Sequence, residues 1–279
     1  MRTPSKPRLK TPPPDVPSMP TDVTPYVSFF DRYLKGTARP VGRPIRYYTM
    51  NGGGWHTTAR WPPAGVRMQR WFFGANATLR RARPASAQGS DRYVVDFGAT
   101  SGNGNRWHTQ EGDDVTYPDR AREDRKLLTY TSSPLAKTIE ITGHPVVTLD
   151  VVSTAKDGAF FVYLEDVASD GRVTYITEGE LRAVHRRISK SKPPYPVFGP
   201  YHSFLRADGE PLVPGQRAQL RFALLPTSVL IEKGHRLRIA IAGADRDTFP
   251  RIPASGRPVI TVARNSVHIS GVELPILAR

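Results

Sequence analysis

A short amphipathic helix near the N-terminus is the clearest helical pattern in the chain. Phe29, Phe30, Tyr33 and Leu34 recur at the spacing of one helical face, with charged residues opposite them. The pattern predicts a helix over 24–36, which opens with a threonine–proline pair and closes at a glycine. So short a helix is marginal in water alone, and we therefore expect its aromatic face to pack against something.

Beyond the helix the pattern changes to short strands. Apolar residues alternate with polar ones through 146–154, 159–167 and 219–225, and turn residues separate the runs. A stretch rich in Gly, Asn and Asp over 98–125 predicts a long loop. Strands do not alternate with helices, which excludes a parallel α/β sheet in this chain. The sequence therefore predicts an all-β, jelly-roll (galactose-binding-like) β-sandwich over 37–279.

The N-terminal residues 1–23 have a different composition, basic and rich in proline. Proline fixes φ and removes amide donors, so we expect a disordered, extended tail here. An apolar stretch of the kind found in secretory signals is missing from it, and no run in the chain approaches the length of a membrane span. These observations favour a cytoplasmic protein.

The formal net charge of +15 raises the question of an anionic partner. The basic residues are scattered along the strands and are not clustered with aromatic residues, which makes nucleic acid an unfavoured partner. A lost acidic partner surface would also leave the chain basic. The sequence has no cysteine, which excludes disulfides, thiolate metal sites and thiol nucleophiles.

Several short motifs follow one another in an order that is specific as a set. They are Phe29-Phe30-Asp31 with Lys35-Gly36, Arg46-Tyr47-Tyr48, the segment 125–135 ending in Ser-Ser-Pro-Leu, Glu178-Gly179-Glu180-Leu181 and Gly234-His235-Arg236-Leu237-Arg238. Together they resemble the C-terminal part of the cocaine esterase (CocE/NonD) and X-Pro dipeptidyl-peptidase family of serine hydrolases. The resemblance covers about residues 26–277. It implies that 24–36 is the last helix of an α/β-hydrolase domain and that 37–279 is the β-sandwich that follows it.

The catalytic residues of that family cannot be placed on this chain. No serine has glycine both two residues before and two residues after it, so the nucleophile elbow is missing, and no histidine precedes Phe29. We therefore expect no catalytic residue, no cofactor and no metal, and an inactive chain when alone. The resemblance implies hydrolysis of acyl esters, amides or X-Pro peptides for a protein that has the missing half, to which this domain would contribute structure or the shape of the substrate cleft.

Two kinds of partner are open for the helix. Phe29, Phe30, Tyr33 and Leu34 are the candidate interface, either with a separate α/β-hydrolase domain or with a second copy of the chain. An alternative function is a module that binds glycans or surfaces through the tryptophans, although packing is the commoner role of so large a side chain. The four are Trp55, Trp61, Trp71 and Trp107.

The remaining polar candidates favour structural roles. Gly234, His235 and Arg236 form a turn that the histidine is expected to hold by hydrogen bonding. The seven histidines show no close ligand pair. The acids at 113–114 and 245–247, and the basic run 182–187, are expected to be solvated loop charges.

Overall fold

In the computed structural model, residues 23–36, 45–107 and 115–278 are described. Helix α1 (Thr24–Leu34) comes first, with Val23 as its N-cap residue and Lys35 as its C-cap. The helix therefore starts at the residue expected to cap it. Gly36 follows in the left-handed conformation, with φ +65°, as its place after the helix predicted. Of the predicted tail over 1–23, residues 1–22 lie outside the described residues.

Fifteen strands follow in the described part of the chain, many of them in the runs that the alternating pattern predicted. Their bounds are β1 (Ile45–Thr49), β2 (Gly54–Thr58), β3 (Val66–Gly74), β4 (Thr78–Arg80), β5 (Ser90–Val94), β6 (Leu128–Ser132), β7 (Ile139–Gly143), β8 (Val146–Ser153), β9 (Ala159–Val167), β10 (Val173–Arg182), β11 (Arg217–Ala223), β12 (Thr227–Ile231), β13 (Arg236–Ala242), β14 (Val259–Ala263) and β15 (Gly271–Leu277). Three 3₁₀ turns accompany them: η2 (Glu123–Lys126), η3 (Ala183–His185) and η4 (Arg206–Asp208). The all-β fold class is confirmed. The jelly-roll strand order remains a prediction.

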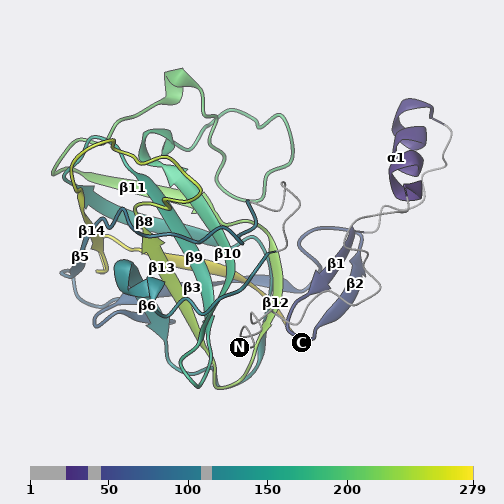
Figure 1. Cartoon of the computed structure of the whole chain (residues 1–279), viewed down its shortest axis with the longest axis horizontal. Coiled ribbons are helices and arrows are strands. Elements are labelled where there is room, and N and C mark those ends of the chain that lie inside the picture. Colours follow the sequence, from purple (N-terminus) through teal and green to yellow (C-terminus); the bar gives the residue numbers. More distant parts are fainter. Residues whose placement is uncertain (1–22, 37–44, 108–114, 279) are drawn as a thin grey trace, which may run out of the picture.

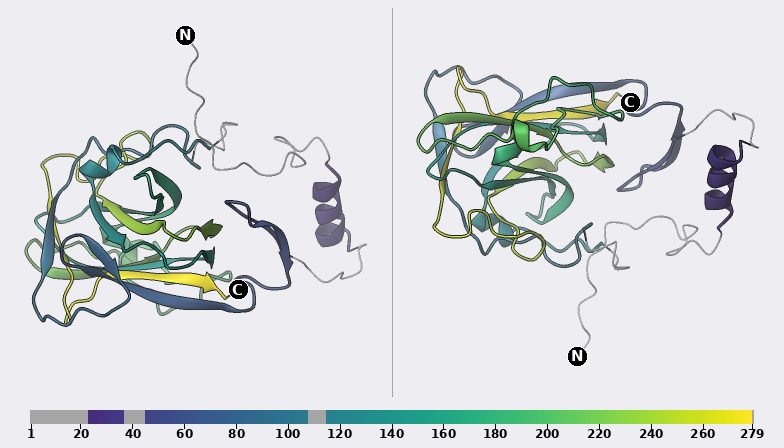
Figure 2. Two further views of the ribbon diagram at one scale, coloured as in Figure 1. Left: turned by 90° about the horizontal axis from the view of Figure 1, so that it is seen from below. Right: turned by 90° about the horizontal axis from the view of Figure 1, so that it is seen from above.

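The strands form one large hydrogen-bonded system beside a separate two-stranded hairpin. Its main path runs β10-β9-β13-β6-β4-β3-β15-β8-β14-β5, with β11 paired to β8, and β7 paired to both β12 and β15. Among the described strands only β4 and β6 pair in parallel. In Figure 2, β3 and β15 run along one face of the body with other strands across from them. β1 and β2 form the hairpin, which projects toward the side where α1 lies.

The core fills the space between the sheet layers. The alternation in β8, β9 and β11 predicted which side chains point inward, and all of them lie in the main buried cluster: Val147, Leu149, Val151, Phe160, Val162, Leu164, Leu220, Phe222 and Leu224 (the last just beyond β11). Burying each such side chain contributes about 1.5–3 kcal/mol.

A second, smaller cluster covers the outer face of β9 and its neighbours. Phe161, Tyr163 and Tyr175 belong to it, with Phe249 packed against them. The segment 96–127, here called the strap, crosses this face, and its described part contains no strand. All nine residues of β9 are buried as a result. The strap corresponds to the long loop that composition predicted, and residues 108–114 of it lie outside the described part.

Candidate functional site

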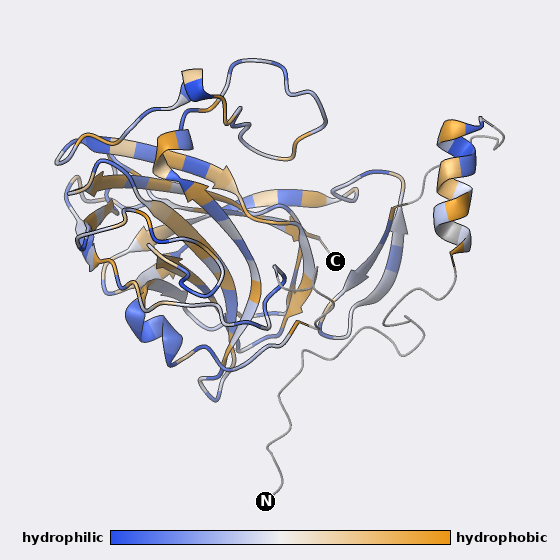
Figure 3. Ribbon diagram, turned by 45° about the horizontal axis from the view of Figure 1, so that its top comes forward, coloured by the Kyte–Doolittle hydropathy of each residue, from blue (hydrophilic) through white to orange (hydrophobic). Residues whose placement is uncertain are grey.

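Helix α1 exposes its aromatic face to solvent. The side chains of Phe29, Phe30, Tyr33 and Leu34 are 55%, 54%, 47% and 77% exposed. The Phe29 and Tyr33 rings lie 4.6 Å apart, so the residues pack mainly on one another. Figure 3 shows the apolar stripes of α1 well away from the sandwich. The helix thus offers an uncovered apolar surface of the kind that marks an interaction site.

The β1–β2 hairpin stands between α1 and the sandwich and is tied firmly to the latter. The turn at Asn51 and Gly52 has φ values of +63° and +90°, the conformation that the Asn-Gly pair favours. The Asn51 amide donates to the carbonyl oxygen of Leu230, 2.9 Å away, and the Thr49 and Ser228 hydroxyls lie 2.7 Å apart. These hydrogen bonds hold the hairpin in a fixed position on the sandwich.

A groove of about 250 Å³ opens between this hairpin, the strap and the start of β12. Aromatic rings and polar groups share its lining, which includes Tyr48, Arg106, Tyr117, Tyr175, Thr227 and Ser228. The hydroxyls of Thr227 and Tyr175 are buried and make no hydrogen bond within the described part of the chain. The groove is thus a hollow at which the hairpin, the strap, β10 and the start of β12 meet.

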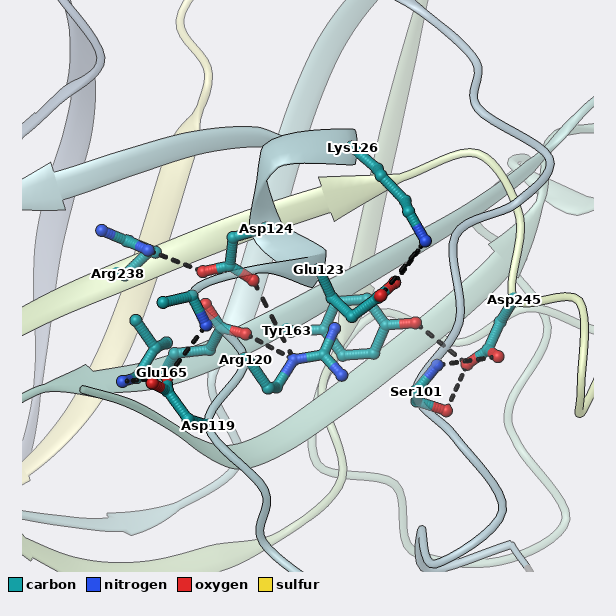
Figure 4. A network of polar contacts seen from close by, with 12 residues as sticks. Ser101, Asp119, Arg120, Glu123, Asp124, Lys126, Tyr163, Glu165, Arg238 and Asp245 are labelled. Atoms are coloured by element: carbon teal, nitrogen blue, oxygen red, sulfur yellow. Dashed lines mark hydrogen bonds and ion pairs between the residues drawn. The ribbon is translucent and has the colours of Figure 1, made fainter. Parts of the chain in front are cut away.

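Beneath the strap lies a network of buried charges (Figure 4). The Arg120 guanidinium donates to Glu165 at 2.9 Å, and Arg238 donates to Asp124 at 2.6 Å. Burial, reinforced by the charge of Asp124, raises the pKa of Glu165 to about 8 although Arg120 opposes this. The network ties the strap to β9 and β13, which gives it a structural role.

A second polar group fixes the other end of the strap. The Ser101 hydroxyl and the Tyr163 hydroxyl both donate to the Asp245 carboxylate, the latter at 3.0 Å. Asp245 is only 3% exposed, so the expectation of a solvated loop charge is wrong at this position. The partners of Asp245 lie more than 80 residues away in the chain, and no local pattern announces them. The acids at 113–114 lie outside the described residues.

Two further carboxylates lie on β10 under the strap. Burial raises the pKa of Glu178 to about 8 and that of Glu180 to about 7, and in both cases the positive charge of Arg106 opposes the shift. Arg106 also donates to the Thr177 hydroxyl at 3.1 Å. The sequence pattern did not identify these glutamates as buried. The sequence feature that indicates their burial is that the neighbouring strand β9 is apolar on both faces, because such a strand must be covered by a second layer.

The turn at Gly234, His235 and Arg236 joins β12 to β13. The His235 Nδ1 atom lies 2.9 Å from an Asp166 oxygen on β9, and Arg236 donates to the carbonyl oxygen of Ser132 at 3.0 Å. Burial raises the pKa of Asp166, and the bond to His235 opposes that shift. These contacts fit the predicted structural role of the turn, which stays a prediction.

The tryptophans do not share one surface. Trp71 is in the core, and Trp107 of the strap packs edge-on against Phe249. The guanidinium of Arg46 lies over the ring of Trp55, 4.3 Å from its centroid. The fourth, Trp61, packs on Tyr47. Each of the four contacts a neighbouring side chain, and Trp55 remains 37% exposed.

Among the described residues, no serine hydroxyl is hydrogen-bonded to a histidine ring, and there is no cluster of three or more potential metal ligands. The basic run 182–187 is paired, with Arg182 on Asp157, Arg186 on Glu210 and Arg187 on Asp208. Helix α1, the only α-helix in the described ranges, is too short to cross a membrane.

Known proteins share extensive sequence similarity with this chain. Residues 42–271 match the family of X-Pro dipeptidyl-peptidase C-terminal non-catalytic domains. The chain belongs to that family. A provisionally named serine esterase of Mycobacterium tuberculosis is 48% identical to this C-terminal domain over 253 residues, which cover 89% of this chain and 40% of the relative. The cocaine esterase of Rhodococcus sp. is 23% identical, with coverage of 92% and 46%.

Solved structures show the same fold. An aminopeptidase from a marine sediment archaeon (Thaumarchaeota archaeon) superimposes with a TM-score of 0.69 at 20% sequence identity, and the match covers 90% of this chain and 43% of that one. This X-Pro dipeptidyl-peptidase C-terminal domain therefore spans less than half the length of the relatives it matches. In those relatives it is joined to a further region.

Proposed function

We propose that this chain serves as the C-terminal domain of a CocE-type serine hydrolase and packs against an α/β-hydrolase domain that carries the catalytic groups. Family membership supports the proposal, as does the 40% share of the mycobacterial relative that the chain covers. Cocaine esterase and X-Pro dipeptidyl-peptidase relatives suggest acyl esters, amides or X-Pro peptides as substrates of the complete enzyme. This domain contributes stability and the shape of the cleft, while the bond chemistry belongs to the other domain.

The exposed face of α1 is the observation that carries the proposal. Phe29, Phe30 and Leu34 are each more than half exposed on a helix of eleven residues, and so short a helix needs tertiary packing to persist in water. A helix that belonged to the sandwich would turn these residues toward it. Residues 24–36 are therefore assigned to the last helix of the α/β-hydrolase domain, and 37–279 to the domain that follows.

The groove between the hairpin and the strap is assigned to the same interface. It opens beside the hairpin, on the side of the sandwich from which the chain continues to α1. A domain seated on α1 and the hairpin would face this hollow. Tyr48 and Tyr117 could then form part of a wall around a substrate, without taking part in bond cleavage.

Self-association through α1 is the second candidate. Two copies could cover each other's Phe29 and Leu34 in place of a hydrolase domain. Sedimentation of the chain at increasing concentration separates the two, because a dimer that Leu34→Glu abolishes would indicate a second copy as the occupant.

A chimera tests the main proposal. The C-terminal region of the mycobacterial relative is replaced by this chain from residue 23, and ester turnover and labelling by a serine-directed phosphonate are measured for chimera and isolated chain. We expect labelling and turnover in the chimera and neither in the isolated chain. Turnover by the isolated chain that the phosphonate abolishes would overturn the proposal.

A further inference from the structure

A second uncovered surface lies far from α1 in the sequence, on the segment 186–208 between β10 and β11. This segment, here called the outer loop, stands away from the sheets (Figures 1 and 3). It exposes Ile188 at 45%, and Tyr195, Phe204 and Leu205 at 62% each. Folded monomers seldom leave several large apolar side chains together in water without an interaction to explain them.

The outer loop is held in place by a buried histidine. The two ring nitrogens of His202 each lie 3.1 Å from a carbonyl oxygen, one of Arg187 within the loop and one of Arg221 on β11. His202 is only 7% exposed. The backbone N–H of Ser189 also donates to Tyr201 at 2.8 Å. The apolar residues are thus presented from a fixed frame, which lowers the entropy lost when a partner binds.

Phe204 combines an unusual backbone conformation with a mostly exposed side chain. Its φ is +56°, in the left-handed region that costs a bulky residue about 1 kcal/mol or more. The Ser203 hydroxyl, which donates to Asp208, holds the turn on one side. The Phe204 ring lies 5.2 Å from the His185 ring and 6.1 Å from the His202 ring, yet Phe204 and Leu205 both remain 62% exposed. Strain that exposes an apolar pair is understandable if the pair inserts into a partner.

The positive charge of the outer loop indicates which kind of partner surface it fits. Lys190, Lys192 and Arg206 are exposed, and the structure gives them no ion pair with a carboxylate among the described residues. A groove of about 420 Å³ lies beside them, lined by Arg187, Ile188, Ser189, Lys190, Ser191 and Asp208. Unpaired cations next to apolar anchors fit an acidic protein surface. A second copy would bring the same cations together, which disfavours it.

The loop also returns to the end of the sandwich where the hairpin lies. The Phe198 ring stacks on His144 at 5.0 Å. His144 directly follows Gly143, which pairs with Thr227 of the groove beside the hairpin. A domain seated on α1 and the hairpin therefore has the outer loop next to its edge.

We propose that the outer loop is a second docking surface for the α/β-hydrolase domain, on which Phe204 and Leu205 insert into an apolar site and Lys190, Lys192 and Arg206 face acidic residues. The inference rests on the proposed function. It assigns a role to a loop that contributes neither to the core nor to the groove, and it explains part of the excess positive charge of the chain.

The chimera with the mycobacterial catalytic region provides the test. The double variant Phe204→Asp/Leu205→Asp is compared with Val267→Asp, which alters an equally exposed apolar residue on a different loop. The pair Lys190→Glu/Lys192→Glu tests the charges without placing acid at the strained turn. Thermal unfolding and the half-life of esterase activity at elevated temperature are measured for the chimeras, and thermal unfolding for the isolated chains.

We expect the isolated chains to unfold at one temperature, and both loop variants to shorten the half-life of the chimera at least about fivefold against the control. If the chimera unfolds in one transition but the loop and control variants have the same half-life of activity, the inference is overturned and the proposed function still stands. Two independent transitions in the unsubstituted chimera would overturn both. Loop-dependent binding of the isolated chain to phosphatidylglycerol vesicles, with no effect in the chimera, would identify a lipid surface as the occupant and also overturn the inference.

Discussion

The Nε atom of Arg120 lies 2.9 Å from a carboxylate oxygen of Glu165, and both side chains are at least 95% buried. Arg120 comes from the strap and Glu165 from β9, so the pair joins an irregular segment to the sheet. Removing one member of a buried pair is costly because it leaves the other charge without compensation.

Arg120→Met should therefore lower the free energy of unfolding by about 3–5 kcal/mol, measured by chemical denaturation. Arg70→Met is the control, because its pair with Glu273 is largely exposed on the Arg70 side and should contribute about 1 kcal/mol or less. Burial raises the pKa of Glu165 to about 8, so this carboxyl can hold a proton at any pH below that value, and the full loss is expected near pH 9, where it is ionised. The loss should be larger at pH 9 than at pH 6, and equal losses in the two variants would contradict the account.

Stability should fall as the pH rises from about 4.5 to 8. The pKa values of Glu178 and Glu180 in the fold are raised to about 8 and 7, above the 4.5 of an unburied glutamate. The folded chain therefore binds more protons than the unfolded chain between pH 4.5 and 8, and each titrating group costs up to about 1.4 kcal/mol per pH unit.

The double variant Glu178→Gln/Glu180→Gln should flatten this slope, with the remainder due to Glu165. Glu232→Gln at an exposed position serves as the control. The midpoints of urea unfolding, measured across the pH range for the unsubstituted chain, the double variant and the control, give these slopes. A slope that the double variant leaves unchanged would show that these carboxyls are not the titrating groups.

Gly271 should tolerate no side chain. A Cβ there would lie 2.2 Å from the carbonyl oxygen of Trp71 and 3.1 Å from the Cα of Phe72, at the point where β15 meets β3. Gly271→Ala should lower the melting temperature by more than 10 °C or prevent folding. Gly158→Ala is the matched control, because the nearest atom is 4.0 Å away, and it should be neutral or slightly stabilising.

The face of α1 should matter only in the presence of a partner. Phe29→Glu and Leu34→Glu, alone or combined, should leave the thermal unfolding of the isolated chain unchanged, because these residues pack on nothing in the sandwich. Both should destabilise the chimera. A drop in the melting temperature of the isolated chain would show that α1 packs on its own sandwich.

Local sequence pattern was enough to place most strands and their inward faces, because alternation reports directly on burial in a half-covered sheet. It missed β2, β4, β7 and β12, each of which has five residues or fewer.

The candidate site was harder to foresee than the fold. The four residues on the face of α1 were identified from helical spacing, and their exposure agrees with the role proposed for them. The burial of Asp245 and the pairing of Arg120 with Glu165 depend on contacts between distant segments, which no local pattern encodes. The docking role of the outer loop likewise depends on Phe204 being strained and exposed, which only the structure reveals.

The central position of β15 determines when this domain can fold during synthesis. β15 pairs with β3, β7 and β8, and Glu273 is hydrogen-bonded to Arg70, 203 residues earlier in the chain. A nascent chain cannot place β15 in the sheet before residue 277 has left the ribosome. Until then, the edges of β3, β7 and β8 that pair with β15 remain unpaired. Pairings so distant in sequence are slow to form. The domain is therefore exposed to aggregation for almost the whole of its translation, and chaperones should be needed most at its last strand.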